Sequence, residues 1–140
     1  MKKLILDKEF SHLNILEKSE YEACQFINCE FEKADLQYIN FIDCTFDNCD
    51  LSNAKINETA FRDVVFESCK LLGLNFEHCN PLLFSCTFNN CNLNLSSFYN
   101  RIVKNCSFDT CDLSDTDFEE ADLTKINFKD CNLTGTLFNQ

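Results

Sequence analysis

The sequence has almost none of the residues that make flexible or collagen-like chains, with two glycines, one proline and no tryptophan among 140 residues. This scarcity excludes a collagen-like protein or a glycine-rich linker. No apolar stretch approaches the ~20 residues that a membrane-spanning helix needs. The opening segment MKKLIL is also too short for the apolar region of a signal peptide. We therefore expect a cytoplasmic chain without a membrane partner.

Basic residues are the next shortage. The chain has twelve Lys and Arg residues but 23 Asp and Glu residues, which gives a formal net charge of −11. Nucleic acids and anionic membranes carry charge of the same sign, so neither is expected as a direct partner. The length allows one domain, and 45% hydrophobic residues are enough for a continuous core. A basic protein partner stays open.

Signals for catalysis and metal binding are also scarce. The sequence contains two histidines, His12 and His78, and neither a glycine-rich phosphate loop nor a G-x-S-x-G motif. His78 adjoins Cys79 but lacks a third group that would orient a nucleophile pair. The eleven cysteines follow C-x4-C spacing and not the C-x2-C spacing of zinc sites. We expect no enzymatic activity, no cofactor and no metal, with reduced cysteines that act as small buried hydrophobes.

What the chain has in abundance is a five-residue repeat. The stretch CTFDNCDLSNA from Cys44 recurs in the same frame as CQFINCEFEKA from Cys24, CTFNNCNLNLS from Cys86 and CSFDTCDLSDT from Cys106. A Phe or Leu occupies the centre of each five except at Ile56 and Val103, and a small or medium residue generally stands two places before it. Helices repeat apolar residues every 3.6 positions and strands every 2, so a period of five indicates a solenoid.

A second period, of twenty residues, indicates that four repeats form one coil of the solenoid. The frame slips by two residues after Phe76 and resumes at Leu83, which predicts an insertion near Asn80, Pro81 and Leu82. Stacking every fourth repeat then gives a column of phenylalanines: Phe26, Phe46, Phe66, Phe88, Phe108 and Phe128. It also gives a column of cysteines: Cys29, Cys49, Cys69, Cys91, Cys111 and Cys131.

The repeats ADLQY at Ala34, CDLSN at Cys49, CDLSD at Cys111 and ADLTK at Ala121 closely resemble the consensus of the pentapeptide-repeat family. The resemblance covers residues 21–140 as a single domain. It implies an all-β protein, a right-handed quadrilateral parallel β-helix of about six coils. Residues 1–20 lie mostly outside the frame and are expected to form an N-terminal cap, because a solenoid needs a unit that covers its end coil. A short strand, a helical turn and a partial first coil all stay open for this cap.

Residues two places after each central position should form the corners of the coils. Asn, Asp and Gly are frequent there and tolerate tight-turn dihedral angles. The positions are Asn28, Lys33, Asp43, Asn48, Asn53, Asp63, Gly73, Asn90, Asn100, Asn105, Asp115 and Gly135. Pro81 and Arg101 break the pattern in one wall, one coil apart, which predicts a local outward bulge.

Two sets of residues are candidates for contacting a partner. Large apolar residues occupy positions that should face solvent near the bulge: Leu72, Phe84, Leu95 and Tyr99. We favour packing beneath the insertion over a partner-binding patch for these four. The second set is acidic and spans a whole coil within residues 105–124: Asp109, Asp112, Asp115, Asp117, Glu119, Glu120 and Asp122. Because Asp112, Asp117 and Asp122 precede three successive central residues, we expect the acids to be dispersed over several walls.

The favoured function is a non-catalytic protein-interaction scaffold. The alternative comes from the family, since LGLNFEHC from Leu72 and KEFS from Lys8 are similar to segments of quinolone-resistance (Qnr-type) members. That resemblance implies an acidic DNA mimic that binds a type II topoisomerase, such as DNA gyrase or topoisomerase IV, and protects it against quinolones or toxins. The short rod and the lack of long loops rank it second.

The final repeat carries Leu133, Leu137 and Phe138, and only Asn139 and Gln140 follow it. Without a cap, this coil would expose strand edges and an apolar cross-section. We expect a symmetric homodimer through this end. The alternative is that the natural chain continues past Gln140.

Overall fold

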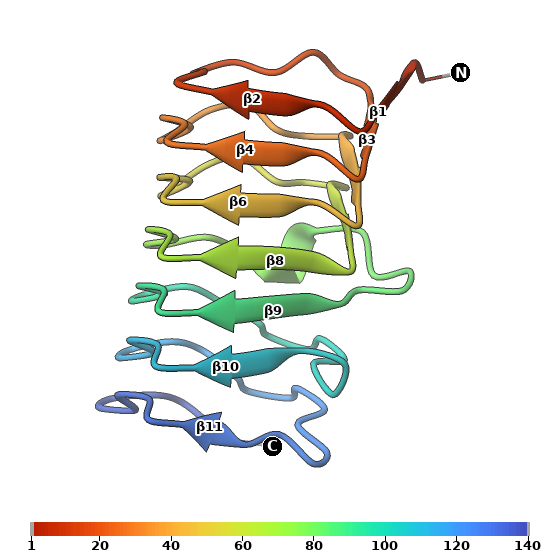
Figure 1. The fold of residues 1–140 in the computed structure, drawn as a ribbon. Helices are drawn as coiled ribbons and strands as arrows, with labels where there is room; N and C mark the ends of the chain where they lie inside the picture. Colours follow the sequence, from red (N-terminus) through yellow and green to blue (C-terminus); the bar gives the residue numbers. More distant parts are fainter. Residues whose placement is uncertain (1, 140) are drawn as a thin grey trace.

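The computed structural model describes residues 2–139, which form a right-handed, four-sided parallel β-helix (Figure 1). The first wall is a four-stranded sheet of β1 (Leu4–Leu6), β3 (Glu20–Glu22), β5 (Asn40–Ile42) and β7 (Ala60–Arg62). The second wall is a seven-stranded sheet of β2 (Glu9–Ser11), β4 (Gln25–Ile27), β6 (Thr45–Asp47), β8 (Val64–Glu67), β9 (Cys86–Asn89), β10 (Ser107–Asp109) and β11 (Phe128–Lys129). This architecture confirms the predicted fold class.

The third and fourth walls are held by single bridges between successive coils. Glu30 pairs with Asp50 on the third wall, and Asp35 pairs with Lys55 on the fourth. Within residues 2–139, the one helical segment is the short 3-10 helix η1 (Phe76–His78) on the fourth wall. No helix in this part of the chain is long and apolar enough to cross a membrane.

The strand pairs confirm both the period of twenty and the slip. Phe46 pairs with Phe66 twenty residues on, whereas Phe66 pairs with Phe88, twenty-two residues on. The seven strands of the second wall account for the six predicted coils and a shorter coil before them. Figure 1 shows the inserted segment between η1 and β9 standing out from the right-hand side of the rod. The predicted outward bulge is therefore confirmed.

The N-terminal segment forms that shorter coil. Leu4 pairs with Glu20 and Phe10 with Phe26, each sixteen residues apart. The ring of Phe10 stacks on Phe26 with centroids 5.4 Å apart. Of the alternatives that the sequence left open, the structure therefore has two strands of a shortened coil. Its role as a cap that covers the rod stays a prediction.

Phenylalanines stack through the interior of the rod. Centroid distances along the second wall are 4.7 Å for Phe26 and Phe46, 5.1 Å for Phe46 and Phe66, and 5.3 Å for Phe66 and Phe88. A second column of phenylalanine rings lies on the fourth wall and includes Phe98. The ring of Phe98 lies edge-on to that of Phe88, with centroids 5.9 Å apart. Aromatic pairs favour both offset-stacked and edge-to-face arrangements, so the core is close to ideal for these rings.

The cysteines occupy inward positions, where eight of the eleven thiols also donate a hydrogen bond to a backbone carbonyl: Cys24, Cys29, Cys44, Cys49, Cys69, Cys91, Cys111 and Cys131. The Sγ of Cys49 donates to the carbonyl of Phe26 in the coil above at 3.2 Å. Thr59 makes the equivalent bond, from Oγ1 to the carbonyl of Leu36, at 2.7 Å. All eleven cysteines are free thiols and ten are buried. The inward position therefore favours a small donor as well as a small hydrophobe, which the sequence alone did not reveal.

The corner residues turn the chain through positive φ. All the predicted corner positions adopt this conformation except Asn105. Gly73 has φ of +66°, and a Cβ there would lie 2.3 Å from Oδ1 of Asn53 in the coil above. Glycine adopts this angle at little cost, and a larger residue here would force the side chain of Asn53 to move.

Candidate interaction surface at the break in the first wall

The two-residue insertion interrupts the first wall immediately below β7. Asn80 Oδ1 accepts a hydrogen bond from the backbone N–H of Leu82 at 2.9 Å, which starts a tight turn next to Pro81. The side chains of Leu82 and Leu83 are 60% and 69% exposed. Solvent-facing leucines at a projecting turn are the kind of feature that a protein partner can bury.

The inserted segment corrects two predictions about which side chains point inward. The regular frame places Leu83 inside the coil, but Leu83 faces solvent with φ of 56°. Phe84, which the frame places outside, is 4% exposed and packs against Phe76 with ring centroids 6.0 Å apart. The extra residues shift the inward position by one, and the larger aromatic ring fills the core. Phe84 is therefore not available to a partner.

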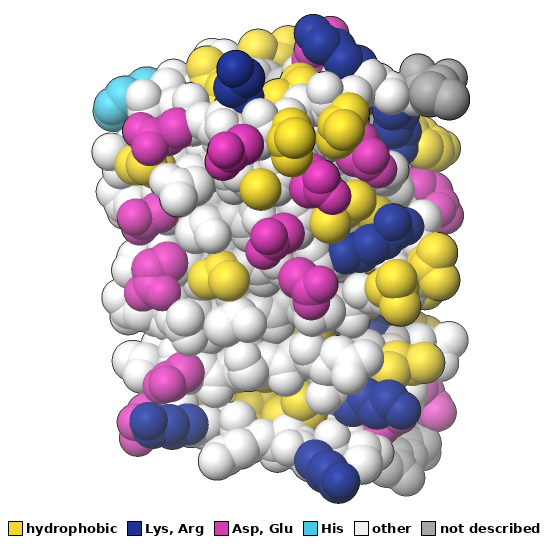
Figure 2. Space-filling view, turned by 45° about the vertical axis from the view of Figure 1, so that its right-hand side comes forward, with side chains coloured by type: hydrophobic (Ala, Val, Ile, Leu, Met, Phe, Trp, Pro, Cys, Tyr) yellow, Lys and Arg dark blue, Asp and Glu magenta, His cyan; other side chains and the backbone are white. Residues whose placement is uncertain are grey.

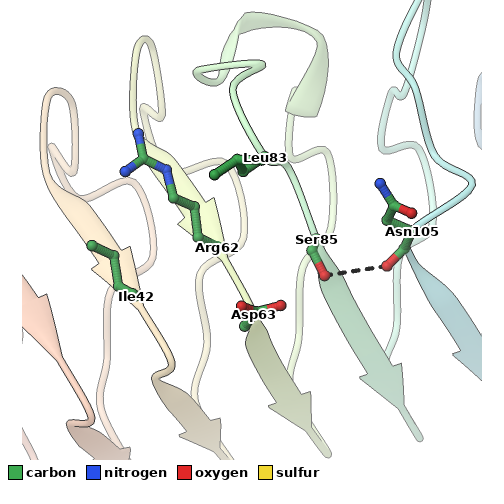
Figure 3. Close-up of a pocket in the computed structure, with 6 residues that line it drawn as sticks. All are labelled: Ile42, Arg62, Asp63, Leu83, Ser85 and Asn105. Atoms are coloured by element: carbon green, nitrogen blue, oxygen red, sulfur yellow. Dashed lines mark hydrogen bonds between the residues drawn. The ribbon is translucent and has the colours of Figure 1, made fainter.

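Beside the insertion lies an open hollow of about 630 Å³. Its lining is drawn in Figure 3 and consists of Ile42, Arg62, Asp63, Leu83, Ser85 and Asn105. Ile42 and Arg62 come from neighbouring strands, and Leu83 comes from the inserted segment. Ser85 Oγ donates to the carbonyl of Asn105 at 3.2 Å, which closes the lower side of the hollow. The hollow thus combines apolar side chains with a cation, a carboxylate and an amide.

Both arginines of this acidic chain hydrogen-bond to carbonyl groups at or next to the insertion. Arg62 donates from Nε to the carbonyl of Leu82 at 3.4 Å. Arg101 donates from Nη2 to the carbonyl of Glu77 at 2.8 Å. Figure 2 shows hydrophobic and basic side chains next to one another on the right-hand side of the rod.

The other apolar candidates lie elsewhere on the rod. Leu95 is 60% exposed at a corner and Tyr99 is 42% exposed on the fourth wall, while Leu72 is partly buried. Leu72 and Leu95 follow third-wall bridges, so the structure does not gather these residues with the insertion. The favoured account, packing beneath the insertion, describes Phe84 but not the exposed Leu95 and Tyr99.

The acidic candidates are dispersed, as the sequence predicts. Asp109 ends β10 on the second wall, and Asp112 lies on the third. Asp117 and Glu119 belong to the fourth wall, Asp122 bridges to Ile102 on the first, and Asp115 and Glu120 occupy corners. Figure 2 shows acidic side chains in several places on the visible face, some of them one above another along its left side.

Several of these carboxylates have a structural role within their own repeat. Asp112 accepts the backbone N–H of Ser114 at 2.9 Å, and Asp122 accepts that of Thr124 at 3.0 Å. The bonds from Thr124 hold the pKa of Asp122 below its usual value. Asn92 makes the same contact to the N–H of Asn94 at 2.9 Å. Asp and Asn are therefore equivalent in turn formation, and the charge is not needed for the fold.

Sequence reasoning missed Arg62, Leu82, Leu83 and Ser85 as surface residues of interest. The stacking period contained part of the signal, because Leu82 follows Arg62 by twenty residues and should lie directly beneath it. The neighbouring irregularities at Pro81 and Arg101 marked the correct wall.

The geometry defines a class of protein, a solenoid built from five-residue units. The chain belongs to the pentapeptide-repeat family: the model of the pentapeptide repeat region matches residues 14–81 and 82–140. The two matched segments meet at the insertion. No curated protein sequence matches the chain.

Three solved structures are similar over nearly the whole chain. The plasmid-mediated fluoroquinolone resistance protein QnrB1 has 20% identity and a TM-score of 0.42, with coverage of 99% of this chain and 87% of that one. HetL, a pentapeptide-repeat protein involved in heterocyst differentiation regulation from Nostoc sp. strain PCC 7120, has 14% identity and a TM-score of 0.30, with 99% and 84% covered. Rfr23 from Cyanothece 51142 has 12% identity and a TM-score of 0.31, with 97% and 91% covered. The family assignment rests on the repeat match and the strand register rather than on these structures.

Proposed function

We propose that the protein is a non-catalytic interaction scaffold that acts in the cytoplasm and binds a protein partner at the break in the first wall. The observation that carries this proposal is the exposure of Leu82 and Leu83 beside the hollow that contains Arg62. Within residues 2–139, no group of three or more His, Cys, Asp or Glu residues is arranged to hold a metal. Metal-free function stays a prediction.

The break has the composition of a binding surface. Partner interfaces favour apolar anchors surrounded by polar groups, and arginine is enriched among the residues that contribute most to affinity. Leu82 and Leu83 supply the apolar anchors, and Arg62 and Ser85 supply the polar surroundings. A matching partner surface would offer an apolar side chain that packs on the two leucines.

A comparison of two exposed apolar sites tests this assignment. Protein retained from a cell extract by the wild type should be lost with a Leu82→Ser/Leu83→Ser variant. It should be retained by a Leu95→Ser variant, which removes a similarly exposed leucine from another side of the rod. Equal retention by both variants would place the partner elsewhere and refute the assignment.

The second candidate is a DNA mimic that binds a type II topoisomerase, such as DNA gyrase or topoisomerase IV. Acidic residues do recur in register at the junction of the second and third walls. Asp47 and Glu67 pair along the second wall, and Glu30 and Asp50 pair along the third. Further along, Asp109 and Asp112 extend the same two columns, separated from the others by Asn89 and Asn92.

The charge density of these columns is lower than that of DNA. Six carboxylates and Lys70 lie along four coil steps of ~4.8 Å, which gives one net negative charge per ~4 Å of rod. Duplex DNA carries one per ~1.7 Å of axis. The mimic therefore ranks second to the scaffold.

A gyrase supercoiling assay, with and without a fluoroquinolone, tests the mimic. The variant with Asp50, Asp109 and Asp112 changed to Asn removes three charges from the two columns, and Asn at positions 50 and 112 can keep the hydrogen bonds to the N–H groups of Ser52 and Ser114. Inhibition or drug protection by the wild type that weakens in the variant would support the mimic. No effect of the wild type on supercoiling, protection or gyrase binding at low salt would eliminate it.

We also propose a symmetric homodimer through the C-terminal coil. Leu133, Leu137 and Phe138 are 37%, 49% and 43% exposed, so this coil presents an apolar cross-section. Light scattering should give twice the monomer mass, and a stable monomer at high concentration would argue against the dimer.

A further inference from the structure

Arg101 occupies a position where the repeat does not accommodate a long side chain. The backbone N–H of Asn80 donates to the carbonyl of Thr59 at 2.9 Å, and the N–H of Asp122 donates in the same way to that of Arg101 at 2.9 Å. Thr59 and Arg101 therefore hold equivalent positions in their coils. In this position the hydroxyl of Thr59 points at a carbonyl inside the coil. Arg101 reaches further, to the carbonyl of Glu77, and places a guanidinium beneath the inserted segment.

Most of this guanidinium lacks a partner. Nε and Nη1 of Arg101 are buried and have no hydrogen-bond partner among residues 2–139. The ion pairs in the described chain join Lys3 to Glu17, Lys18 to Asp35 and Lys129 to Asp109, so none involves Arg101. Arginine stays protonated in proteins, and burying its donors unpaired is unfavourable. Two nitrogen atoms of this partly buried cation thus lack a hydrogen-bond partner, which an anion could supply.

A small hollow lies next to this cation. It measures about 150 Å³ and is lined by Pro81, Phe84, Asn100, Arg101 and Ile102. The insertion supplies Pro81 and Phe84, so the hollow exists because the chain departs from its regular coil. It offers one cationic group, one amide and three apolar side chains.

We propose that this hollow is an anion site that takes a carboxylate. The guanidinium matches a carboxylate in charge and in planar hydrogen-bond geometry. The apolar lining suits the carbon atoms attached to a carboxylate better than the oxygens that surround phosphate. A chain of net charge −11 also opposes a dianion more strongly than a monoanion. The carboxylate can come from a small metabolite or from a Glu or Asp side chain of a partner.

NMR of the arginine Nε–H groups gives a direct test, because the chain has two arginines and hence two such signals. Arg62 serves as the internal control, since it lies on β7 and makes a single bond to Leu82. An Arg62→Lys variant assigns the remaining signal to Arg101 without altering the site. Sodium acetate replaces sodium chloride at constant ionic strength in one titration, and N-acetyl-glutamate amide replaces it in another.

The site predicts a saturable downfield shift of the Arg101 Nε proton with acetate, and no comparable shift of Arg62. A response to acetate alone would indicate a free small carboxylate, and a response to both probes would indicate that a partner's side chain can enter. An Arg101→Lys variant should lose the acetate-induced protection against thermal unfolding that the wild type shows. Absence of a saturable shift, or equal shifts of both arginines, would overturn the proposal. This result is independent of partner capture at Leu82 and Leu83.

Discussion

Removing one ring from the middle of the phenylalanine column should destabilise the whole rod. Phe66 is fully buried and lies between Phe46 and Phe88 at 5.1 and 5.3 Å, with interplanar angles of 14° and 5°. It also contacts Phe61 at 5.9 Å. A Phe66→Ala change therefore removes two stacked contacts and one tilted contact and leaves a cavity between two coils.

The cost can be estimated from these contacts. Burial of a Phe side chain contributes about 1.5–3 kcal/mol, and each aromatic pair adds about 0.5–1.5 kcal/mol. With the cavity included, the loss should reach ~3–5 kcal/mol, the range for buried Phe→Ala changes. Phe128 lies in the last coil, is only partly buried and tilts by 35° against Phe108 at 5.5 Å. Phe128→Ala should therefore cost less, about half as much or lower.

Urea denaturation followed by far-UV circular dichroism measures both losses. Phe66→Leu is the matched control, since it retains part of the buried volume and should recover about half of the lost stability. Phe26→Ala should resemble Phe66→Ala, because Phe10 covers Phe26 and makes it an internal ring. Equal, small losses at Phe66, Phe26 and Phe128 would refute the continuous stack.

Three further predictions concern thiols, corners and pH. Burial raises the pKa of the Cys44 thiol to about 12, so this residue should react with thiol reagents at neutral pH only after denaturation, as mass spectrometry can show. Gly73→Ala should destabilise the protein by more than about 1 kcal/mol, and Asn53→Gly in the same chain should restore part of that loss in a urea melt, because it removes the clash with Oδ1. Hydrogen bonds from Lys18 and Gln37 lower the pKa of Asp35 to about 2. The ionised Asp35 carboxylate therefore stabilises the fold fully above pH ~3.9, and this contribution is lost as the pH falls through about 2. A Lys18→Met variant should raise the pKa of Asp35 in an NMR titration.

The sequence predicts the regular part of this fold well because each inward position tolerates few residue types. Phe46 and Phe66 lie where stacking by twenty places them, and Phe88 lies where the slip of two places it. The thiol hydrogen bonds escaped prediction because residue type alone does not distinguish a small apolar group from a weak donor. The cysteine column satisfies both requirements at Cys49, and Thr59 shows that the donor matters.

The inserted segment was predictable in place but not in conformation. A single extra pair of residues can be absorbed by several backbone paths, and the choice depends on which side chain best fills the core. Phe84 supplies a larger ring than Leu83 and packs on Phe76, so Leu83 turns out to solvent. That competition depends on coil-to-coil packing and not on the local pattern of five.

The most direct test of the account places a photo-crosslinking amino acid at position 83, 95 or 112 of the full chain in living cells. The insertion, a corner leucine and the acidic columns are then compared in one experiment. We expect an adduct with a protein partner from position 83 and none from positions 95 and 112. Crosslinking from position 112 without crosslinking from position 83 would contradict it and move the binding surface to the acidic columns.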